Sequence, residues 1–141
     1  IHRALHIPFL YKHVHALHHR NINVGPWSGL SMHPVEHLIF LGSVLVHFVV
    51  AAHPVHILFH LQYYALTAAT THTGFEGMVF KDKNRLKLGT FHHQMHHRYF
   101  ECNYGSLELP WDKWFGSFHD GTVESDTKIR ERRKKFTNGA K

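Results

Sequence analysis

The sequence predicts an all-α fold: a membrane-embedded helical bundle with a histidine-rich cap that holds a di-metal site. Two observations predict it. Eighteen of the 141 residues are histidine, and many of them are spaced to share one face of a helix. Two apolar runs joined by a single break lie between the histidine clusters. The length is enough for one domain. Because the chain begins at Ile1, inside a histidine motif, we expect further sequence upstream of it.

The first two elements are expected to be helices separated by Pro8. Residues 1–7 have a helical pattern, and a proline disfavours helix in the residue before it. Residues 9–20 form a second helical run. Residues 21–31 contain two glycines and a proline, so they are predicted to be a loop.

An apolar hairpin is expected to follow. A helix should begin near Pro34, because proline is favoured in the first helical turn, and continue through residues 38–52. His53-Pro54 breaks it, and residues 57–71 form a second apolar run. Each run has about 15 residues, short of the roughly 20 that span a bilayer upright. The pattern indicates a hairpin that dips into a membrane or barely crosses it. A pair of buried helices in a soluble protein is the alternative.

The remaining elements are shorter. Residues 80–90 are polar and basic and are predicted to form a loop. Thr90 is a candidate cap for a short helix over residues 91–99. Residues 103–116 hold glycines, a proline and two tryptophans, and are expected to be irregular but ordered.

Charge divides the chain unevenly. Residues 126–141 carry seven Lys and Arg against two Asp and Glu, whereas residues 1–125 carry nine against eight. We therefore expect a catalytic domain over 1–125 and a basic tail over 126–141, with disorder from about Gly121 onward. A basic tail can bind nucleic acid or an anionic membrane surface, and it can also be simply solvated. Of the two partners we expect the membrane, and no nucleic acid.

The clustered histidines carry the chemistry. They are His2 and His6; His15, His18 and His19; and His93, His96 and His97, with His92 just before the last three. Residues three and four apart lie on one helix face, so each cluster should project its imidazoles from one patch. Imidazole suits zinc, copper, iron and nickel, whereas magnesium and calcium prefer oxygen ligands.

The number of these histidines indicates two metals. The clusters supply eight candidates and His72 is a plausible ninth, whereas one tetrahedral zinc needs four ligands. The chain has no Glu-x-x-His motif, which excludes a carboxylate-bridged di-metal bundle. Its single cysteine, Cys102, excludes thiolate zinc fingers and iron–sulfur clusters.

Isolated histidines are expected not to bind metal, because a lone histidine is usually a surface or core residue. They are His13, His47, His53, His56, His60 and His119. One short motif offers a rival metal site. His33, Glu36 and His37 match H-x-x-E-H, the inverted zinc-peptidase pattern, in which the glutamate is the general base.

These stretches resemble the fatty acid hydroxylase superfamily, especially its sterol desaturase, sterol methyl oxidase and cholesterol hydroxylase branch. The resemblance covers residues 1–120, and the order and spacing of the motifs agree. The similar motifs are His2-Arg-Ala-Leu-His6, Leu10 to His19, His33-Pro-Val-Glu36, His72-Thr-Gly-Phe-Glu76, His92 to His97, Asn103-Tyr-Gly105 and Trp111 to Gly116. Ser117 stands where the superfamily usually has threonine.

The resemblance implies an integral membrane protein with a non-haem di-iron centre on the cytosolic side. That membrane would be the endoplasmic reticulum in a eukaryote and the inner membrane in a bacterium. Such enzymes use O2 and two electrons to hydroxylate or desaturate lipids, here sterol-like or fatty-acyl. The implied ligands are His2, His6, His15, His18, His19, His72, His93, His96 and His97. His33, His92, Glu36 and Glu76 are candidates for groups beside the ligands. Zinc can replace iron on overexpression, because such sites favour zinc over Fe(II).

The other partners follow from what the chain lacks. No Gly-x-Gly-x-x-Gly motif is present, so electrons must come from a donor protein, of the cytochrome b5 or ferredoxin type in such systems. The apolar run from Leu38 to Thr71 is the natural wall for a lipid, with Phe75, Phe91 and Trp111 as candidate contacts. Two alternatives remain: a histidine-rich metal-binding or transport membrane protein, and the zinc peptidase.

Overall fold

The computed structural model describes residues 1–106 and 108–139, apart from the side chains at 84, 85, 133 and 135–139. Its elements are α1 (His2–Leu5), α2 (Pro8–His13), η1 (His15–Arg20), η2 (Pro26–Leu30), α3 (Pro34–Gly42), η3 (Ser43–Phe48), α4 (Pro54–Thr70), β1 (Gly77–Phe80), β2 (Lys83–Lys87), α5 (Thr90–Tyr99), α6 (Trp111–Trp114) and α7 (Val123–Gly139), where η marks a 3-10 helix. The described chain is mostly helical, as predicted.

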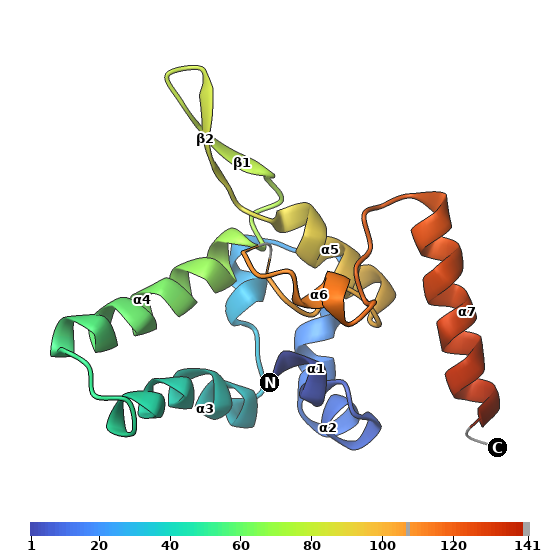
Figure 1. Ribbon diagram of the computed structural model, residues 1–141, viewed down its shortest axis with the longest axis horizontal. Coiled ribbons are helices and arrows are strands. Elements are labelled where there is room, and N and C mark those ends of the chain that lie inside the picture. Colours follow the sequence, from blue (N-terminus) through green and yellow to red (C-terminus); the bar gives the residue numbers. More distant parts are fainter. Residues whose placement is uncertain (107, 140–141) are drawn as a thin grey trace.

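The elements form a compact centre with three extensions (Figure 1). The short helices α1, α2, η1, α5 and α6 gather in the centre, which we call the histidine cap. An apolar hairpin, made of α3, η3 and α4, extends to one side. Strands β1 and β2 project from the cap as an antiparallel ribbon, and α7 lies along the opposite edge. The cap therefore lies where the extensions meet.

The second predicted helix is interrupted. The chain is α-helical over Pro8–His13 and then changes at Val14 to the 3-10 helix η1. A 3-10 helix has three residues per turn, so His15 and His18 lie one above the other, with stacked rings 5.4 Å apart. The prediction of one continuous helix over 9–20 is therefore wrong. The predicted loop over 21–31 contains the short helix η2.

The polar stretch predicted as a loop over 80–90 is mostly a β-hairpin. Lys81 and Asp82 connect the strands with φ values of 50° and 57°, the left-handed conformation that two-residue hairpin turns require. The β-branched and aromatic residues Val79 and Phe80 before the turn were the overlooked signal. The helix predicted over 91–99 is confirmed as α5, with Thr90 as its first residue rather than its cap.

The predicted disordered end is replaced by α7. Ile129 on this helix is 4% exposed and packs against Met95 and Cys102 of the cap. Asp120 accepts hydrogen bonds from the backbone and hydroxyl of Thr122, just before the helix begins. The composition of this segment, which is rich in charged residues, predicted disorder. Composition does not reveal the buried contact of Ile129 or the local turn at Asp120.

The interior of the cap is polar rather than apolar. The largest fully buried side chains among the described residues include His15, His96, His97 and Asn103. The apolar cluster consists of Met95, Cys102 and Ile129, with Tyr99 packed against it. The cap is therefore built around imidazoles, with a small apolar cluster behind α5.

Two polar side chains fix the irregular segment after α5. Asn103 donates to the carbonyls of His92 and His119 at 3.0 and 2.9 Å. Asp112 accepts from the backbone N–H groups of Tyr104 and Gly105 at 3.0 and 2.8 Å. This segment was predicted to be irregular but ordered, and these bonds give it one fixed path across the cap.

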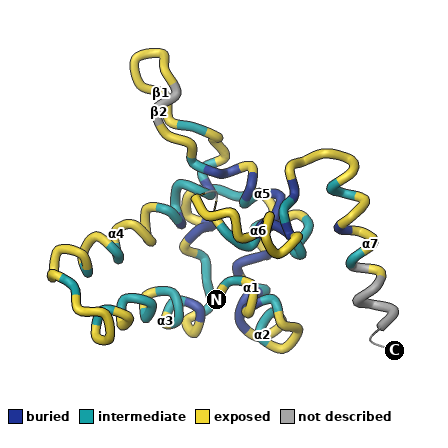
Figure 2. Tube along the Cα trace, in the orientation of Figure 1, coloured by how far each residue is buried: buried dark blue, intermediate teal, exposed yellow. Residues whose placement is uncertain are grey.

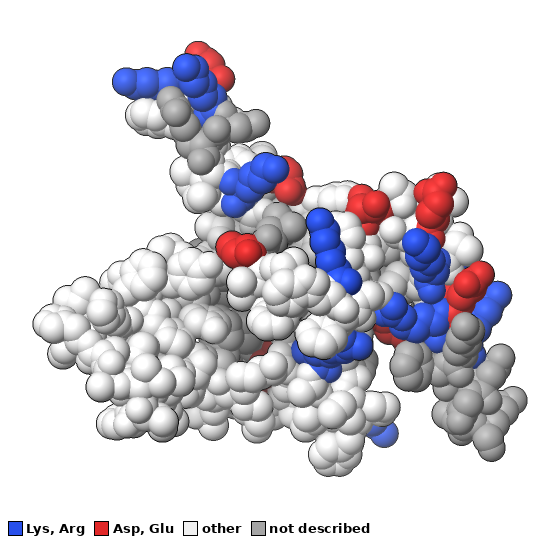
Figure 3. All heavy atoms as spheres, in the orientation of Figure 1, with Lys and Arg blue, Asp and Glu red and all other residues white. Residues whose placement is uncertain are grey.

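The apolar hairpin presents its side chains outward. Residues 37–75 contain no Asp, Glu, Lys or Arg. Phe48 and Val49 at its tip are each 87% exposed, and much of α3, η3 and α4 is exposed in Figure 2. In Figure 3 the surface of the apolar hairpin carries no charged side chains. The charged side chains gather on the cap, the β-hairpin and α7. Within the described residues, no helix has the length and apolar character needed to cross a membrane. A membrane-spanning bundle stays a prediction.

Candidate metal centre

The nine histidines expected to be ligands come together in two adjacent groups. The first group is His2, His6, His15, His19 and His96; the second is His18, His72, His93 and His97. Within each group, one ring nitrogen of every member lies within 4.8 Å of the corresponding nitrogen of every other member. Each group is able to hold a metal ion.

Both H-x-x-H-H motifs contribute to both groups. His15 and His19 of η1 belong to the first group, whereas His18 belongs to the second. On α5, His96 belongs to the first group and His93 and His97 to the second. The three rings of each motif do lie together as one patch, with ring centres no more than 5.9 Å apart. Each motif spans the two groups and holds them next to each other.

The facing atoms are the Nε2 nitrogens. In the first group, the Nε2 of His15 lies 3.1 Å from that of His2 and 3.0 Å from that of His19. The Nε2 of His96 lies 3.1 Å from those of His6 and His19. In the second group, the Nε2 of His97 is 3.2 Å from that of His72 and 3.1 Å from that of His93. The rings thus converge on two centres.

Backbone carbonyls fix several of the rings from behind. The Nδ1 of His2 donates to the carbonyl of Tyr104 at 2.7 Å, and that of His96 donates to Cys102 at 2.6 Å. His72 donates to the carbonyl of Ala68 at 2.7 Å, one turn back on α4. His18 lies 3.3 Å from the carbonyl of Ser31. A carbonyl only accepts, so each Nδ1 carries the hydrogen and each neutral ring has a bare Nε2.

Bare nitrogens in contact fit a metal rather than a hydrogen bond. His2 is fixed by a carbonyl, and His15 donates its Nδ1 hydrogen to the carboxylate of Glu36 at 2.7 Å. Their lone pairs face each other at 3.1 Å. Two nitrogens at right angles around a metal, each bonded at about 2.1 Å, are about 3.0 Å apart. The observed spacing matches that of neighbouring ligands.

Burial keeps these rings in the neutral form that binds metal. Desolvation, reinforced by neighbouring imidazoles, lowers the pKa of His2 to about 3 and that of His97 to about 2. Desolvation also lowers the pKa of His15 and of His72 to about 4. At neutral pH all four are uncharged. Nitrogen ligands without negative charge suit the divalent transition metals.

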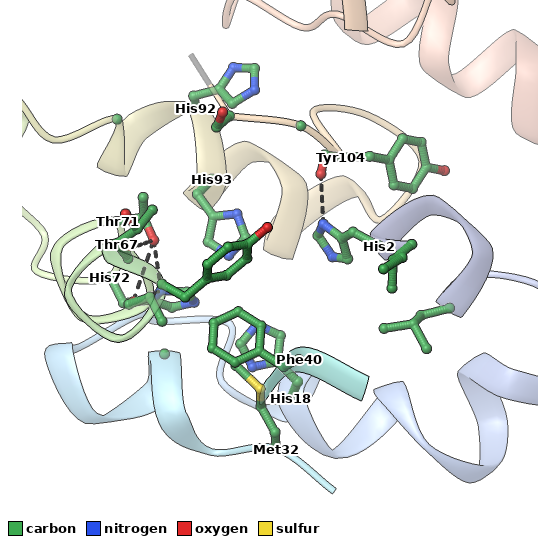
Figure 4. Close-up of a pocket in the computed structure, with 18 of the residues that line it drawn as sticks. His2, His18, Met32, Phe40, Thr67, Thr71, His72, His92, His93 and Tyr104 are labelled. Atoms are coloured by element: carbon green, nitrogen blue, oxygen red, sulfur yellow. Dashed lines mark hydrogen bonds between the residues drawn. The ribbon is translucent and has the colours of Figure 1, made fainter. Parts of the chain in front are cut away.

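A cavity of about 510 Å³ opens onto these histidines. His2, His18 and His93 line it, and Figure 4 shows their rings on different sides of it. The apolar hairpin supplies one part of the remaining wall, with Ile39, Phe40, Tyr63, Tyr64 and Thr67. Another part comes from residues 87–89 and 104–106 and from Glu108. Trp111 lines the cavity as anticipated, whereas Phe75 and Phe91 are not among its lining residues. The cavity joins the metal centre to the inner face of the hairpin.

The sequence model of the fatty acid hydroxylase family matches residues 1–117. The chain belongs to the fatty acid hydroxylase family. It is 31% identical over 135 residues to a putative Delta(7)-sterol-C5(6)-desaturase 2 of Arabidopsis thaliana, covering 90% of this chain and 46% of that protein. It is 34% identical over 130 residues to the lathosterol oxidase of Rattus norvegicus, covering 88% of this chain and 42% of the relative.

A third relative is the Delta(7)-sterol 5(6)-desaturase of Saccharomyces cerevisiae, 32% identical over 117 residues, with 83% of this chain and 31% of the relative covered. This fatty acid hydroxylase chain thus spans less than half the length of each of these relatives. The predicted sterol desaturase branch is confirmed. No solved structure matches the chain significantly.

The candidate groups beside the ligands have different surroundings in this member of the family. Glu36 accepts from the ligand candidate His15. His92 lies on α5 with its Nε2 3.5 Å from Asp112, and its ring points away from His93 in Figure 4. Glu76 accepts from the backbone N–H of Phe91 and so caps α5. Only Glu36 and Glu76 thus support ligands or the helix that carries them by a direct hydrogen bond.

The rival zinc-peptidase motif does not assemble. His33 caps α3, where its Nδ1 accepts from the backbone N–H of Val35. Glu36 is committed to His15 instead. Among the described residues, neither His33 nor His37 joins a group able to hold metal. The geometry therefore favours the family's histidine centre.

Three of the isolated histidines make contacts that the sequence did not indicate. His119 is 2% exposed, stacks on Tyr99 with ring centres 4.8 Å apart, and accepts from the backbone of Gly121. His47 and His60 contact each other at 3.1 Å within the apolar hairpin. His119 is therefore a buried structural residue, and it lies outside both metal-binding groups. The carbonyls that orient the ligands were also missed, since every residue type supplies one.

We predict that Glu36 controls occupancy of one metal position. Removing a group that orients a ligand typically lowers metal affinity about 10- to 100-fold. Glu36→Gln keeps an acceptor for His15, whereas Glu36→Ala leaves its Nδ1 hydrogen without one. In a titration with chelators of increasing affinity, Glu36→Ala should lose one of its two metal ions to a weaker chelator than the wild type does. Glu36→Gln should show a smaller difference from the wild type. Glu124→Gln on exposed α7 is the control; equal loss in all three variants would contradict the prediction.

We also predict acid sensitivity of the metal-free chain. His15 and His72 have folded-state pKa values of about 4, below the ordinary 6.5. Between these two pKa values the unfolded chain binds protons that the folded chain does not. The contribution of the two histidines to the free energy of unfolding is therefore complete above pH 6.5 and is lost as the pH falls towards 4. Each such group weakens the fold by about 1.4 kcal/mol per pH unit in that window. Thermal unfolding followed by circular dichroism should show a steep fall between pH 6.5 and 5, displaced to lower pH by bound metal. An unchanged melting temperature across this range would contradict it.

Proposed function

We propose that this chain is the metal-binding part of a membrane-bound non-haem di-iron oxygenase that hydroxylates or desaturates a lipid. One observation carries the proposal: two adjacent groups of neutral histidines, with converging Nε2 atoms, open onto a cavity that is lined in part by an apolar hairpin. The family and the sterol desaturase relatives support a sterol-like lipid. A fatty-acyl lipid is the other substrate class in the proposal.

Two iron ions held by the nine histidines would supply the activation of O2, since acid–base chemistry by side chains does not break an unactivated C–H bond. The chain's own residues do the rest. Glu36 and the carbonyls of Tyr104, Cys102 and Ala68 orient the imidazoles. Phe40 and Tyr64 line the cavity and would position an apolar substrate beside the imidazoles. A packed apolar wall also limits the entry of water.

The proposal includes an electron donor and a membrane face. Electrons would come from a partner protein of the cytochrome b5 or ferredoxin type. The histidine cap and the basic α7 would lie on the cytosolic side, in keeping with the excess of Lys and Arg in this helix. The membrane would be the endoplasmic reticulum or the bacterial inner membrane. A metal-transport role fits less well, because cargo sites do not need rings fixed from behind by carbonyls.

The reaction is tested with labelled oxygen. Iron-loaded protein, an electron donor and a panel of sterols and fatty-acyl lipids should give label in the product if the lipid is hydroxylated. If the lipid is desaturated, the label should appear in water. His18→Ala and His96→Ala, one from each group, should lose metal and more than about 100-fold of the activity. Exposed His13→Ala should retain both. No lipid turnover by the metal-loaded wild type, or equal loss in all three variants, would contradict the proposal.

Membrane insertion by the apolar hairpin is tested separately. Phe48, Val49 and Val50 at its tip are 87%, 87% and 61% exposed. Inserting each side chain should contribute about 1.5–3 kcal/mol, so changing all three to serine should weaken liposome binding at least about tenfold. Val123→Ser, at an equally exposed valine on α7, should bind liposomes like the wild type. Flotation that is unchanged in the triple variant would show that the hairpin does not anchor the chain.

A further inference from the structure

A chain of hydrogen bonds crosses the apolar hairpin from α4 to the cavity. The Nε2 of His47 lies 3.1 Å from the Nδ1 of His60, and the Nε2 of His60 lies 3.0 Å from the Oγ of Ser43. The Oγ of Ser43 donates to the carbonyl of Phe40 at 2.7 Å. Ser43 also lines the cavity. A polar chain in the middle of an uncharged, largely apolar segment therefore ends on the cavity wall.

The hydrogens in this chain can be assigned. A serine hydroxyl has one hydrogen, and that of Ser43 goes to a carbonyl, which only accepts. The contact with His60 must then be a donation from its Nε2 to Ser43. Neutral His60 is left with a bare Nδ1, which accepts from the Nε2 of His47. Every contact runs in one direction, towards Phe40.

This assignment leaves Ser43 able to accept but not to donate. A hydroxyl oxygen accepts two hydrogen bonds, and His60 uses one of them. The remaining position matches a hydroxyl donor on a ligand in the cavity. An ether or ester lipid offers acceptors only and finds no donor at Ser43. The contact would therefore distinguish free alcohols from their ethers and esters.

The surroundings of Ser43 suit the apolar body of such a ligand. The ring of Tyr64 stacks on that of His60, with ring centres 4.7 Å apart and planes at 20°. The same tyrosine meets Phe40 edge-on, with ring centres 5.1 Å apart. Both Tyr64 and Phe40 line the cavity. Stacking on Tyr64 and the contact with His47 limit rotation of the His60 ring, so the acceptor at Ser43 has a fixed place beside the aromatic wall.

We propose that Ser43, held by His60 and His47, binds the hydroxyl of a lipid alcohol in the cavity. This inference rests on the proposed function in taking the ligand to be a lipid substrate, and it narrows the substrate class to lipids with a free hydroxyl. Ser43 lies seven residues after Glu36, about 10 Å along the helix axis. It is therefore a specificity residue separate from the metal ligands, and replacing it should leave metal content unchanged.

The test measures binding rather than turnover. Metal-loaded protein in nanodiscs is titrated with radiolabelled lathosterol and its 3-methyl ether, and with hexadecan-1-ol and its methyl ether. Wild type should prefer the alcohol in at least one pair by about fivefold, the effect of one neutral hydrogen bond. Ser43→Ala should remove that preference by weakening alcohol binding alone, and Ser43→Thr should keep it. Ser106→Ala, at another serine lining the cavity, should also keep it.

The outcomes separate this inference from the proposed function. Equal binding of alcohol and ether in both pairs, absence of binding in both pairs, or a preference that survives Ser43→Ala would overturn the inference. Oxidation of lipids without any alcohol preference would overturn the inference alone. An alcohol preference that depends on Ser43, in a protein that oxidises no lipid, would overturn the proposed oxygenase activity and leave the binding site standing.

Discussion

The structure depends on pairs of bare imidazole nitrogens that face each other at about the spacing of two metal ligands. His2 and His15 show the constraint most clearly, because acceptors behind both rings leave their Nε2 lone pairs in contact at 3.1 Å. Such contacts are repulsive without a cation between them. The small apolar cluster around Met95 adds little compensation. Folding of the cap should therefore be coupled to metal binding, as it is in small metal domains generally.

That constraint explains the short and irregular elements of the cap. The carbonyls of Cys102 and Tyr104 reach the rings of His96 and His2 only because the segment after α5 turns back across the cap. Asp112 holds that turn by accepting from two successive backbone N–H groups. Residues that never approach the metals thus determine the orientation of the ligands. Long regular helices in these places would carry their carbonyls away from the rings.

The sequence predicted which histidines meet but not how they divide. Spacings of three and four residues identify a helix face, so eight of the nine were accessible from spacing, and the resemblance to the family adds His72. The placing of His15 and His19 in one group and of His18 in the other could not be predicted. It depends on a 3-10 helix and on partners more than 50 residues away. The orienting carbonyls carry no residue signature. Helix α7 was missed because its order comes from tertiary packing of Ile129, which local composition does not encode.

The apolar hairpin joins the metal centre to an exposed apolar surface by using two faces of the same helices. Its outer face is uncharged and exposed, with Phe48 and Val49 at the tip. Its inner face supplies Phe40 and Tyr64 to the cavity, and His72, at the end of α4, belongs to the second histidine group. In the proposed function, a lipid would pass from the exposed outer face into the cavity that the inner face lines. The exposed apolar surface of the hairpin and the apolar part of the cavity wall would then serve the same ligand.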